Sequence, residues 1–262
     1  MIDQEPYRNP LKSSWQEGKQ TVNGWLAIPS NVTAEVMAHQ GWDSLTFDMQ
    51  HGLVDYTDTL PMLAAISTTP TVAMARLPWL EESLIMKMLD AGCDGVICPM
   101  VNSAEDAKRL VNACRYPPQG IRSFGPIRKG IYAGPNYYKT ANEEVLSFAM
   151  IETLNGLDNL EDILSVDGLS GVYVGPADLS MALGCTPKFD QEEKPVVEAI
   201  EKVVTTARSK GKWVGVHNLT PEYALRMTAL GANFVTVASD LRLMTKAASE
   251  AISTFKRGLD KL

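Results

Sequence analysis

The stretch SLTFDMQHGLVDY, residues 44–56, passes from apolar and β-branched residues directly to side chains that exchange protons or bind cations. Asp48, Gln50 and His51 lie within four positions of one another. A carboxylate, an amide and an imidazole at the end of a strand are costly to desolvate unless they are paired or bound to a ligand. The ends of the other apolar runs show whether this feature is isolated.

Several of those runs also end in charged or polar residues, namely Arg76, Glu152, the segment Gly175–Pro176–Ala177–Asp178, His217 with Asn218, and Ser239 with Asp240. Glu152 and Asp178 are hard oxygen ligands of the kind that Mg²⁺ and Mn²⁺ prefer, and ion pairing with Arg76 or Arg122 is the alternative. The stretch GPADLSMALG places N–H groups at a helix start, where they favour a carboxylate or another anion. These residue types indicate a site for a small anionic ligand.

The strand ends belong to a repeating pattern. Strand-like runs cover residues 24–30, 44–50, 69–76, 94–101, 144–153, 170–179, 212–218 and 233–240. Segments with helical spacing cover 31–41, 55–67, 81–92, 103–115, 156–166, 194–211, 220–231 and 241–258. Eight strand–helix units predict an α/β fold, a closed (β/α)₈ TIM barrel rather than an open doubly wound sheet, and in such barrels the carboxyl ends of the strands carry the active site.

We expect one domain over residues 1–262, with a helical extension over about 1–22 that includes a short helix near SSWQEGK. Two connections are longer than the others, 116–143 and 184–194. The first is rich in Gly, Pro, Tyr and Arg, and we expect it to fold over the site. No G-x-G-x-x-G follows the first strand, which disfavours a dinucleotide-binding fold.

Composition narrows the class of partner and the compartment. The 24 basic and 31 acidic residues give a net charge of −7 without a run of five like charges, which disfavours nucleic acid and anionic membranes. The first residues lack a signal-peptide pattern and no apolar window reaches membrane-spanning length, so we expect a cytoplasmic protein. The 4 cysteines include no C-x-x-C pair, which indicates reduced, buried thiols.

Imine chemistry is disfavoured because it needs a lysine that points into the barrel from a strand. Lys212 begins its strand at the wrong end, and Lys129 and Lys139 lie in the long connection. No glycine-rich phosphate loop is visible in HNLTPE or ASDLRL. Small carboxylate substrates are therefore favoured over sugar phosphates.

With these residues assembled, the chain resembles the metal-dependent (class II) pyruvate aldolases of the 4-hydroxy-2-oxoheptane-1,7-dioate aldolase and 2-dehydro-3-deoxyglucarate aldolase (HpcH/HpaI aldolase/citrate lyase) family. The resemblance runs from about Gly24 to the C-terminus. The motifs that carry it are D-M-Q-H-G at 48–52, Arg76, L-D-A-G at 89–92, P-M-V at 99–101, R-Y-P-P-x-G-I-R at 115–122, I-E-T at 151–153 and V-G-P-A-D-L-S at 174–180.

The resemblance implies a (β/α)₈ barrel that cleaves 4-hydroxy-2-oxo acids to pyruvate or hydroxypyruvate and an aldehyde. It also implies a homo-hexamer, a trimer of dimers that exchange their last helix. The site residues that it implies are Glu152 and Asp178 as ligands of Mg²⁺, Mn²⁺ or Co²⁺, His51 as base with Asp90 as its partner, Arg76 for the enolate, and Gln50, Gly175, Pro176 and Ala177 for substrate binding.

Two positions depart from the pattern of the family. Many members have glutamate in place of Gln50 and glutamine in place of Met150. The alternative functions are a lyase for a malyl- or citramalyl-CoA thioester, for which the long connection offers Arg122, Arg128 and Lys129, and a non-catalytic carboxylate-binding barrel. The aromatic residues near Phe124, Tyr132, Tyr137 and Tyr138 are a candidate aldehyde pocket, from this chain or from a neighbouring one.

Overall fold

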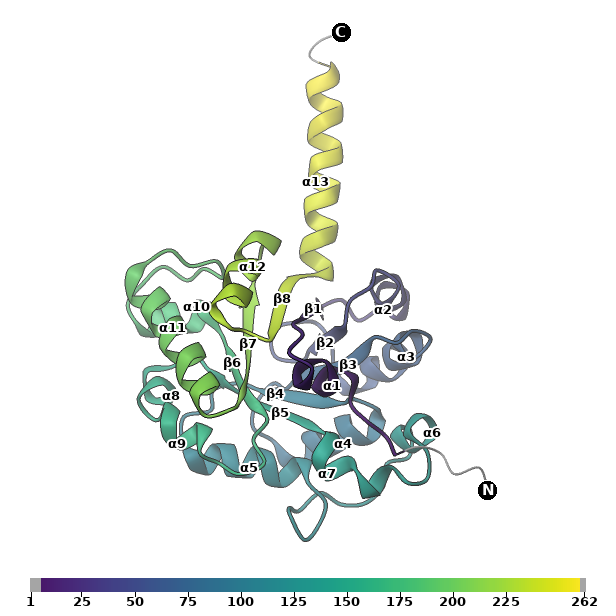
Figure 1. The fold of residues 1–262 in the computed structure, drawn as a ribbon. Helices are drawn as coiled ribbons and strands as arrows, with labels where there is room; N and C mark the ends of the chain where they lie inside the picture. Colours follow the sequence, from purple (N-terminus) through teal and green to yellow (C-terminus); the bar gives the residue numbers. More distant parts are fainter. Residues whose placement is uncertain (1–5, 260–262) are drawn as a thin grey trace.

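Eight parallel strands form a closed barrel in which each strand pairs with the next along the chain and the last pairs with the first (Figure 1). The strands are β1 (Thr21–Leu26), β2 (Ser44–Asp48), β3 (Val72–Arg76), β4 (Gly95–Cys98), β5 (Leu146–Ile151), β6 (Gly171–Val174), β7 (Trp213–Asn218) and β8 (Phe234–Ser239). The structure, a computed structural model, describes residues 6–259. The predicted (β/α)₈ fold is confirmed.

Helices follow the strands and cover the outside of the barrel (Figure 1). They are α2 (Asn31–Ala38), α3 (Tyr56–Ile66), α4 (Glu82–Ala91), α5 (Ala104–Cys114), α8 (Leu154–Asp158), α9 (Leu160–Leu164), α10 (Pro176–Ala182), α11 (Lys194–Ser209) and α12 (Pro221–Leu230). The helix after β8, α13 (Asp240–Leu259), is the exception. Several helices begin where the sequence provides a capping hydroxyl. Ser30, Ser103, Thr153 and Thr220 each accept a backbone N–H from the first turn of the helix that follows.

The amino ends of the strands are closed by α1 (Pro10–Gln16), which begins at the N-cap Asn9. Trp15 of this helix is 4% exposed, and its ring packs against Phe148, Trp213 and Phe234 at centroid distances of 5.8, 5.3 and 5.6 Å. The sequence predicted a short helix in this extension, and the structure places it a few residues earlier. Residues 1–5 of the predicted extension lie outside the described residues.

The connection 116–143 lies at the amino ends of the strands, so the expectation that it folds over the site of its own chain is wrong. It contains α6 (Lys129–Ala133), η1 (Tyr137–Lys139) and α7 (Ala141–Glu144). Lys129 pairs with Asp94, which directly precedes β4, and Arg122 pairs with Asp90 near the end of α4. The reason is topological: the connection follows α5 and precedes β5, and a barrel helix returns the chain to the amino end of the next strand.

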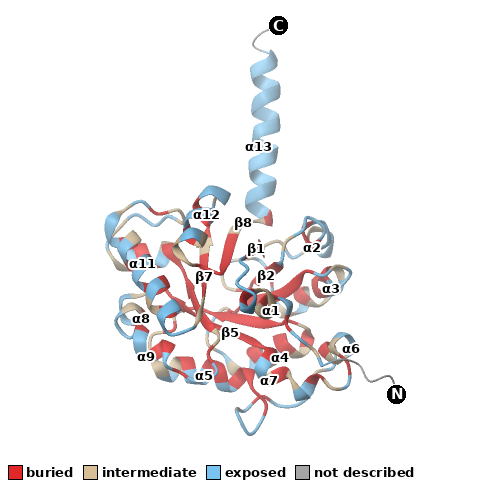
Figure 2. Cartoon of the chain, in the orientation of Figure 1, coloured by how far each residue is buried: buried red, intermediate tan, exposed pale blue. Residues whose placement is uncertain are grey.

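The last helix, α13, leaves the barrel and stands away from it (Figure 1). Its side chains are exposed along nearly its whole length, and only its base is buried (Figure 2). At that base, the Asp240 carboxylate accepts the N–H groups of Ala27 (2.9 Å) and Ile28 (3.2 Å), which ties the helix to the carboxyl end of β1. Within residues 6–259, no helix is long and apolar enough to cross a membrane.

Candidate active site

A cavity of about 1060 Å³ opens at the carboxyl ends of the strands. Its lining includes His51, Arg76, Glu152, Gly175, Pro176, Ala177 and Asp178, all of which the sequence placed at strand ends. Trp25, Asp48, Met150, Phe189 and His217 line the same cavity, together with residues at the base of α13. The structure therefore brings most of the predicted site residues around one space.

Arg76 is held rigidly at the edge of this cavity. Its Nε and one terminal nitrogen donate to the two carboxylate oxygens of Asp48 at 3.0 and 2.6 Å, because strand register places these two residues side by side. The guanidinium also lies 4.4 Å from the centroid of the Trp25 ring. Burial opposes ionisation of Asp48, but the charge and hydrogen bonds of Arg76 outweigh it and hold the pKa of Asp48 below its usual value.

The DMQHG motif forms a tight turn after β2. The same Asp48 carboxylate accepts the backbone N–H groups of Gln50 (3.2 Å) and His51 (3.0 Å). A Cβ on Gly52 would lie 2.3 Å from the carbonyl oxygen of Asp48, so only glycine fits there. The turn leaves the His51 side chain exposed at the rim of the cavity.

Glu152 is the buried carboxylate of the site, with 3% of its surface exposed. Its Oε1 accepts the backbone N–H of Met100 at 2.8 Å, and Met100 adopts a left-handed φ of 55°. Burial, with the negative charge of Asp178 adding to it, raises the pKa of Glu152 to about 7. Among residues 6–259, no lysine, arginine or histidine lies within ion-pair distance of this carboxylate.

These properties fit a divalent cation between Glu152 and Asp178. A cation would stabilise the ionised form of the buried Glu152 carboxylate, and Asp178 is exposed beside it in the first turn of α10. A Cβ on Gly175 would lie 2.3 Å from Oε2 of Glu152, so glycine lets the carboxylate approach this backbone. The part of the chain that the structure describes has no cluster of three or more His, Cys, Asp or Glu side chains suited to a metal. A site with two protein ligands leaves positions for water and substrate, as Mg²⁺ sites commonly do.

Two of the predicted site residues lie elsewhere. The side chain of Gln50 does not line the cavity, and its Oε1 is buried with no hydrogen-bond partner among residues 6–259. Asp90 lies near the end of α4 and binds Arg122 at 2.8 Å. The predicted pair of His51 with Asp90 is therefore not formed within this chain, because α4 carries Asp90 away from the carboxyl ends of the strands.

Several residues that build the site were not assigned a role from the sequence. The Trp25 ring supports Arg76, the Asp48 carboxylate orients it, and the Met100 N–H binds Glu152. Asp48 had a visible signal, since it begins the polar cluster at the end of β2. The sequence carries no signal for Met100, because this residue binds Glu152 through its backbone N–H and not through its side chain.

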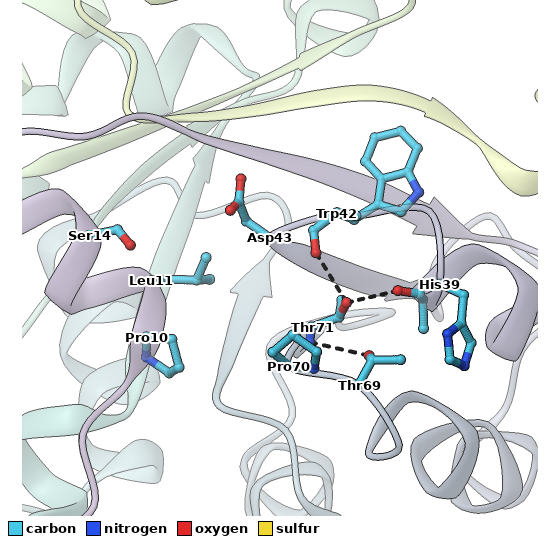
Figure 3. A pocket seen from close by; sticks show the side chains of 11 residues that line it. Pro10, Leu11, Ser14, His39, Trp42, Asp43, Thr69, Pro70 and Thr71 are labelled. Atoms are coloured by element: carbon cyan, nitrogen blue, oxygen red, sulfur yellow. Dashed lines mark hydrogen bonds between the residues drawn. The ribbon is translucent and has the colours of Figure 1, made fainter.

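A second cavity, of about 390 Å³, lies at the opposite end of the barrel between α1 and the loops before β2 and β3 (Figure 3). The Thr71 hydroxyl lies between the backbone carbonyls of Ala38 (3.2 Å) and Trp42 (3.1 Å). The Asp43 carboxylate accepts the N–H of Val22 at 2.8 Å. These polar groups hold the loops together, so the residues suited to catalysis are those at the carboxyl ends of the strands.

Comparison with known proteins shows the family of this chain. Residues 23–247 match the model of the HpcH/HpaI aldolase/citrate lyase family. The chain belongs to this family. It is 41% identical to a hydroxypyruvate/pyruvate aldolase of Rhizorhabdus wittichii, over 94% of this chain and 98% of that protein. It is 34% identical to a 4-hydroxy-2-oxo-heptane-1,7-dioate aldolase of Shigella flexneri, over 94% and 93%.

A solved structure of an HpcH/HpaI aldolase/citrate lyase family protein from Burkholderia cenocepacia has the same fold, with a TM-score of 0.87 and 28% identity. The match covers 95% of this chain and 99% of that one. The expected family is thus confirmed, and this member of the HpcH/HpaI family is an enzyme of the aldolase class, a carbon–carbon lyase.

Proposed function

We propose that this enzyme is a divalent-metal-dependent aldolase that reversibly cleaves 4-hydroxy-2-oxo acids to pyruvate or hydroxypyruvate and an aldehyde. The observation that carries the proposal is the convergence of one rigid arginine, two carboxylates and an imidazole on one cavity. Glu152 and Asp178 would hold Mg²⁺, Mn²⁺ or Co²⁺. When bound, such a cation acts as a Lewis acid that polarises the 2-oxo group and acidifies C3.

The chain's own residues bind and orient the ketoacid. The N–H groups of Ala177 and Asp178 lie in the first turn of α10, where no intrahelical acceptor exists for them, and they would hold the substrate carboxylate. Pro176 and the absence of a side chain at Gly175 leave this backbone open to a close approach. The fixed Arg76 donates to the enolate oxygen, whose negative charge develops as the carbon–carbon bond breaks and is lost as the bond forms.

His51 moves the proton. In cleavage it accepts the proton of the 4-hydroxyl group and returns it to C3 of the enolate. In synthesis it accepts a proton from C3 of the ketoacid and returns it to the aldehyde oxygen, directly or through a water. If Asp90 orients this imidazole, it must come from a second copy of the chain, because Asp90 of the same chain is paired with Arg122 at the far end of the barrel. Gln50 then acts on the substrate only through the turn that carries His51.

The proposal includes assembly into a homo-hexamer, a trimer of dimers. Its support is α13, whose exposed residues Leu241, Met244, Ile252, Phe255 and Leu259 recur at helical spacing along one side. We propose small-molecule 2-oxo acid and aldehyde substrates, with neither nucleic acid nor membrane as partner. We also propose that residues 1–262 form a single domain and that the enzyme is cytoplasmic, in keeping with free thiols at Cys93, Cys98 and Cys114.

The CoA-thioester alternative loses support at the long connection. Of the three basic side chains considered for phosphate binding, Arg122 and Lys129 are buried and paired with Asp90 and Asp94. They lie at the opposite end of the barrel from Glu152. Within one chain, these charges are not placed to bind the phosphates of a substrate in the cavity.

The decisive experiment measures exchange of the pyruvate methyl protons with D₂O by NMR. Protein treated with EDTA should exchange at the uncatalysed rate, and added Mn²⁺ or Mg²⁺ should restore catalysis. Equal exchange rates with and without the cation would show that the Lewis-acid role is wrong. In parallel, H51A should lose pyruvate release from 4-hydroxy-2-oxo acids by about 100-fold or more while still binding Mn²⁺. The exposed His39, which follows α2 directly, provides a matched control, H39A, with unchanged activity.

A further inference from the structure

His217 lines the same cavity but takes no part in the proton transfers proposed above. It projects from β7 between the rings of Trp25 and Phe189, at centroid distances of 4.9 and 4.7 Å. The Trp25 ring also supports the Arg76 guanidinium, so His217 and Arg76 share one wall. The imidazole of His217 therefore faces the cavity beside Arg76, next to the proposed position of the ketoacid.

A chain of hydrogen bonds inside the barrel ends at this imidazole. The indole N–H of Trp25 donates to the hydroxyl of Thr236 at 2.8 Å, and the amide nitrogen of Asn23 donates to the same oxygen at 3.1 Å. The Thr236 hydroxyl lies 2.5 Å from the hydroxyl of Tyr173. The Tyr173 hydroxyl lies 3.4 Å from Nδ1 of His217.

The orientation of the Asn23 amide sets the direction of this chain. Its oxygen accepts the hydroxyl protons of Ser44 (2.8 Å) and Thr46 (3.0 Å), which leaves the NH₂ group to face Thr236. An indole N–H can only donate. Both lone pairs of the Thr236 hydroxyl therefore accept hydrogen bonds, from Trp25 and from Asn23.

The hydroxyl protons of Thr236 and Tyr173 then have one acceptor each. The Thr236 proton goes to the Tyr173 oxygen. Among residues 6–259, Nδ1 of His217 is then the only acceptor within hydrogen-bond distance of the Tyr173 hydroxyl, so we infer that the Tyr173 proton goes to Nδ1. Nδ1 is an acceptor, so a neutral His217 carries its proton on Nε2. Burial and the charge of Arg76 lower the pKa of His217 to about 3, and the ring stays neutral throughout the neutral range.

We propose that His217 presents a fixed Nε2–H donor to the cavity and that this donor selects substrates with an oxygen at that point over analogues that lack it. The inference rests on the proposed aldolase function and names its preferred substrate class. The oxygen belongs either to the C3 hydroxyl of a hydroxylated ketoacid or to a hydroxyl of the aldehyde. A neutral donor binds both without acting as an acid or base.

The kinetic test compares two ketoacids and two aldehydes in all four pairs: pyruvate or hydroxypyruvate with propanal or glycolaldehyde. H217L should keep kcat/KM for pyruvate with propanal within about threefold and lose about tenfold for pairs with the recognised hydroxyl, a loss that corresponds to about 1.4 kcal/mol and to one neutral hydrogen bond. If H217L loses its preference for hydroxypyruvate over pyruvate, the recognised oxygen is the C3 hydroxyl of the ketoacid. If it loses its preference for glycolaldehyde over propanal, the oxygen belongs to the aldehyde. H217Q, which retains an N–H donor, should recover part of the preference. Unchanged selectivity of H217L in both arms would overturn the proposal.

A second measurement reads the tautomer directly. The chain has only 3 histidines, so labelling with ¹⁵N-histidine and ¹⁵N NMR can resolve each imidazole. At neutral pH, His217 should show a protonated Nε2 and an unprotonated Nδ1, and Y173F should weaken this preference. A protonated Nδ1 with a bare Nε2 would contradict the inference.

The same spectra separate this inference from the proposed function. If the Mg²⁺-loaded enzyme releases no pyruvate from any 4-hydroxy-2-oxo acid, the proposed function is wrong. In that case the ¹⁵N shift of Nε2 still tests the donor, because hydroxypyruvate or glycolaldehyde should move it more than pyruvate or propanal. Equal shifts with all four compounds would refute the donor role.

Discussion

At the scale of single residues, the site depends on how Asp48 fixes Arg76. The pair is buried, with two hydrogen bonds between the side chains and an aromatic ring below the guanidinium. A lysine at this position would present one mobile ammonium instead of a planar group bound at two points. The arrangement therefore fixes the direction of the remaining arginine N–H groups before substrate arrives.

D48N should destabilise the protein, because it leaves the Arg76 charge buried without a counter-ion. We expect the free energy of unfolding to fall by about 3–5 kcal/mol in chemical denaturation. The matched control is E82Q, which breaks a largely exposed pair with Arg109 and should change it by less than about 1 kcal/mol. Equal effects of the two substitutions would contradict the buried-pair interpretation.

The effect of D48N should also depend on pH. Because the pKa of Asp48 is lower in the folded protein than in the unfolded chain, its stabilisation is present above the unfolded value, near 4, and is lost as the pH falls through the folded value. The stability difference between wild type and D48N should therefore shrink below about pH 4. Denaturation curves at pH 7 and at pH 3.5 would measure it.

G175A should weaken cation binding, because its Cβ would lie 2.3 Å from Oε2 of Glu152 and displace that carboxylate. We expect the affinity for Mn²⁺, measured by electron paramagnetic resonance, to fall at least about tenfold, which corresponds to about 1.4 kcal/mol. G130A is the control, since nothing lies within 4 Å of a Cβ at that position. An unchanged affinity in G175A would remove Glu152 from the proposed ligands.

The sequence indicated which residues lie together where those residues end a strand, and it gave no such indication where position depends on longer-range geometry. His51, Arg76, Glu152 and Asp178 meet because parallel strands end at the same edge of the barrel. Asp90 carries no such signal, because its place on α4 is fixed by the direction of the helix. Their chemical roles remain predictions that the experiments above address.

At the scale of elements, α1 matters as the cover of the barrel's amino end. W15A should lower the free energy of unfolding by about 3–5 kcal/mol, because it removes a ring that packs among three buried or half-buried aromatic residues. W79A is the comparison: Trp79 is 58% exposed, and its replacement should have little effect in the same denaturation assay. A small effect of W15A would mean that the cover is dispensable.

The sequence predicted the alternation of strands and helices, but it predicted the first and last residues of these elements less accurately. β1 begins at Thr21, ahead of the predicted start at 24, since Thr21 and Asn23 pair with β8 despite their polar side chains. The sixth strand ends at Val174, because Pro176 begins α10. Hydrophobicity alone does not reveal a strand whose polar side chains form hydrogen bonds with neighbouring strands inside the barrel, as Asn23 does with Thr236 and Ser44.

At the scale of the whole molecule, α13 presents an apolar stripe that its own barrel does not cover. A charge placed on this stripe should disrupt the proposed assembly, so I252E with F255E should sediment as a smaller species in analytical ultracentrifugation. S253E, on the polar side of the same helix, is the control and should sediment as wild type. A monomeric wild-type protein, or a double variant of unchanged size, would contradict the proposed hexamer.

The Trp15 ring and its aromatic neighbours also limit how molecules enter and leave. Because α1 covers the amino end of the barrel, we expect molecules to reach the proposed catalytic cavity only from the carboxyl ends of the strands. A ketoacid bound against Glu152 must arrive before the aldehyde that blocks its way out, and after cleavage the aldehyde must depart first. We therefore expect steady-state kinetics of a compulsory-order mechanism, in which the cleaved aldehyde is released ahead of the ketoacid.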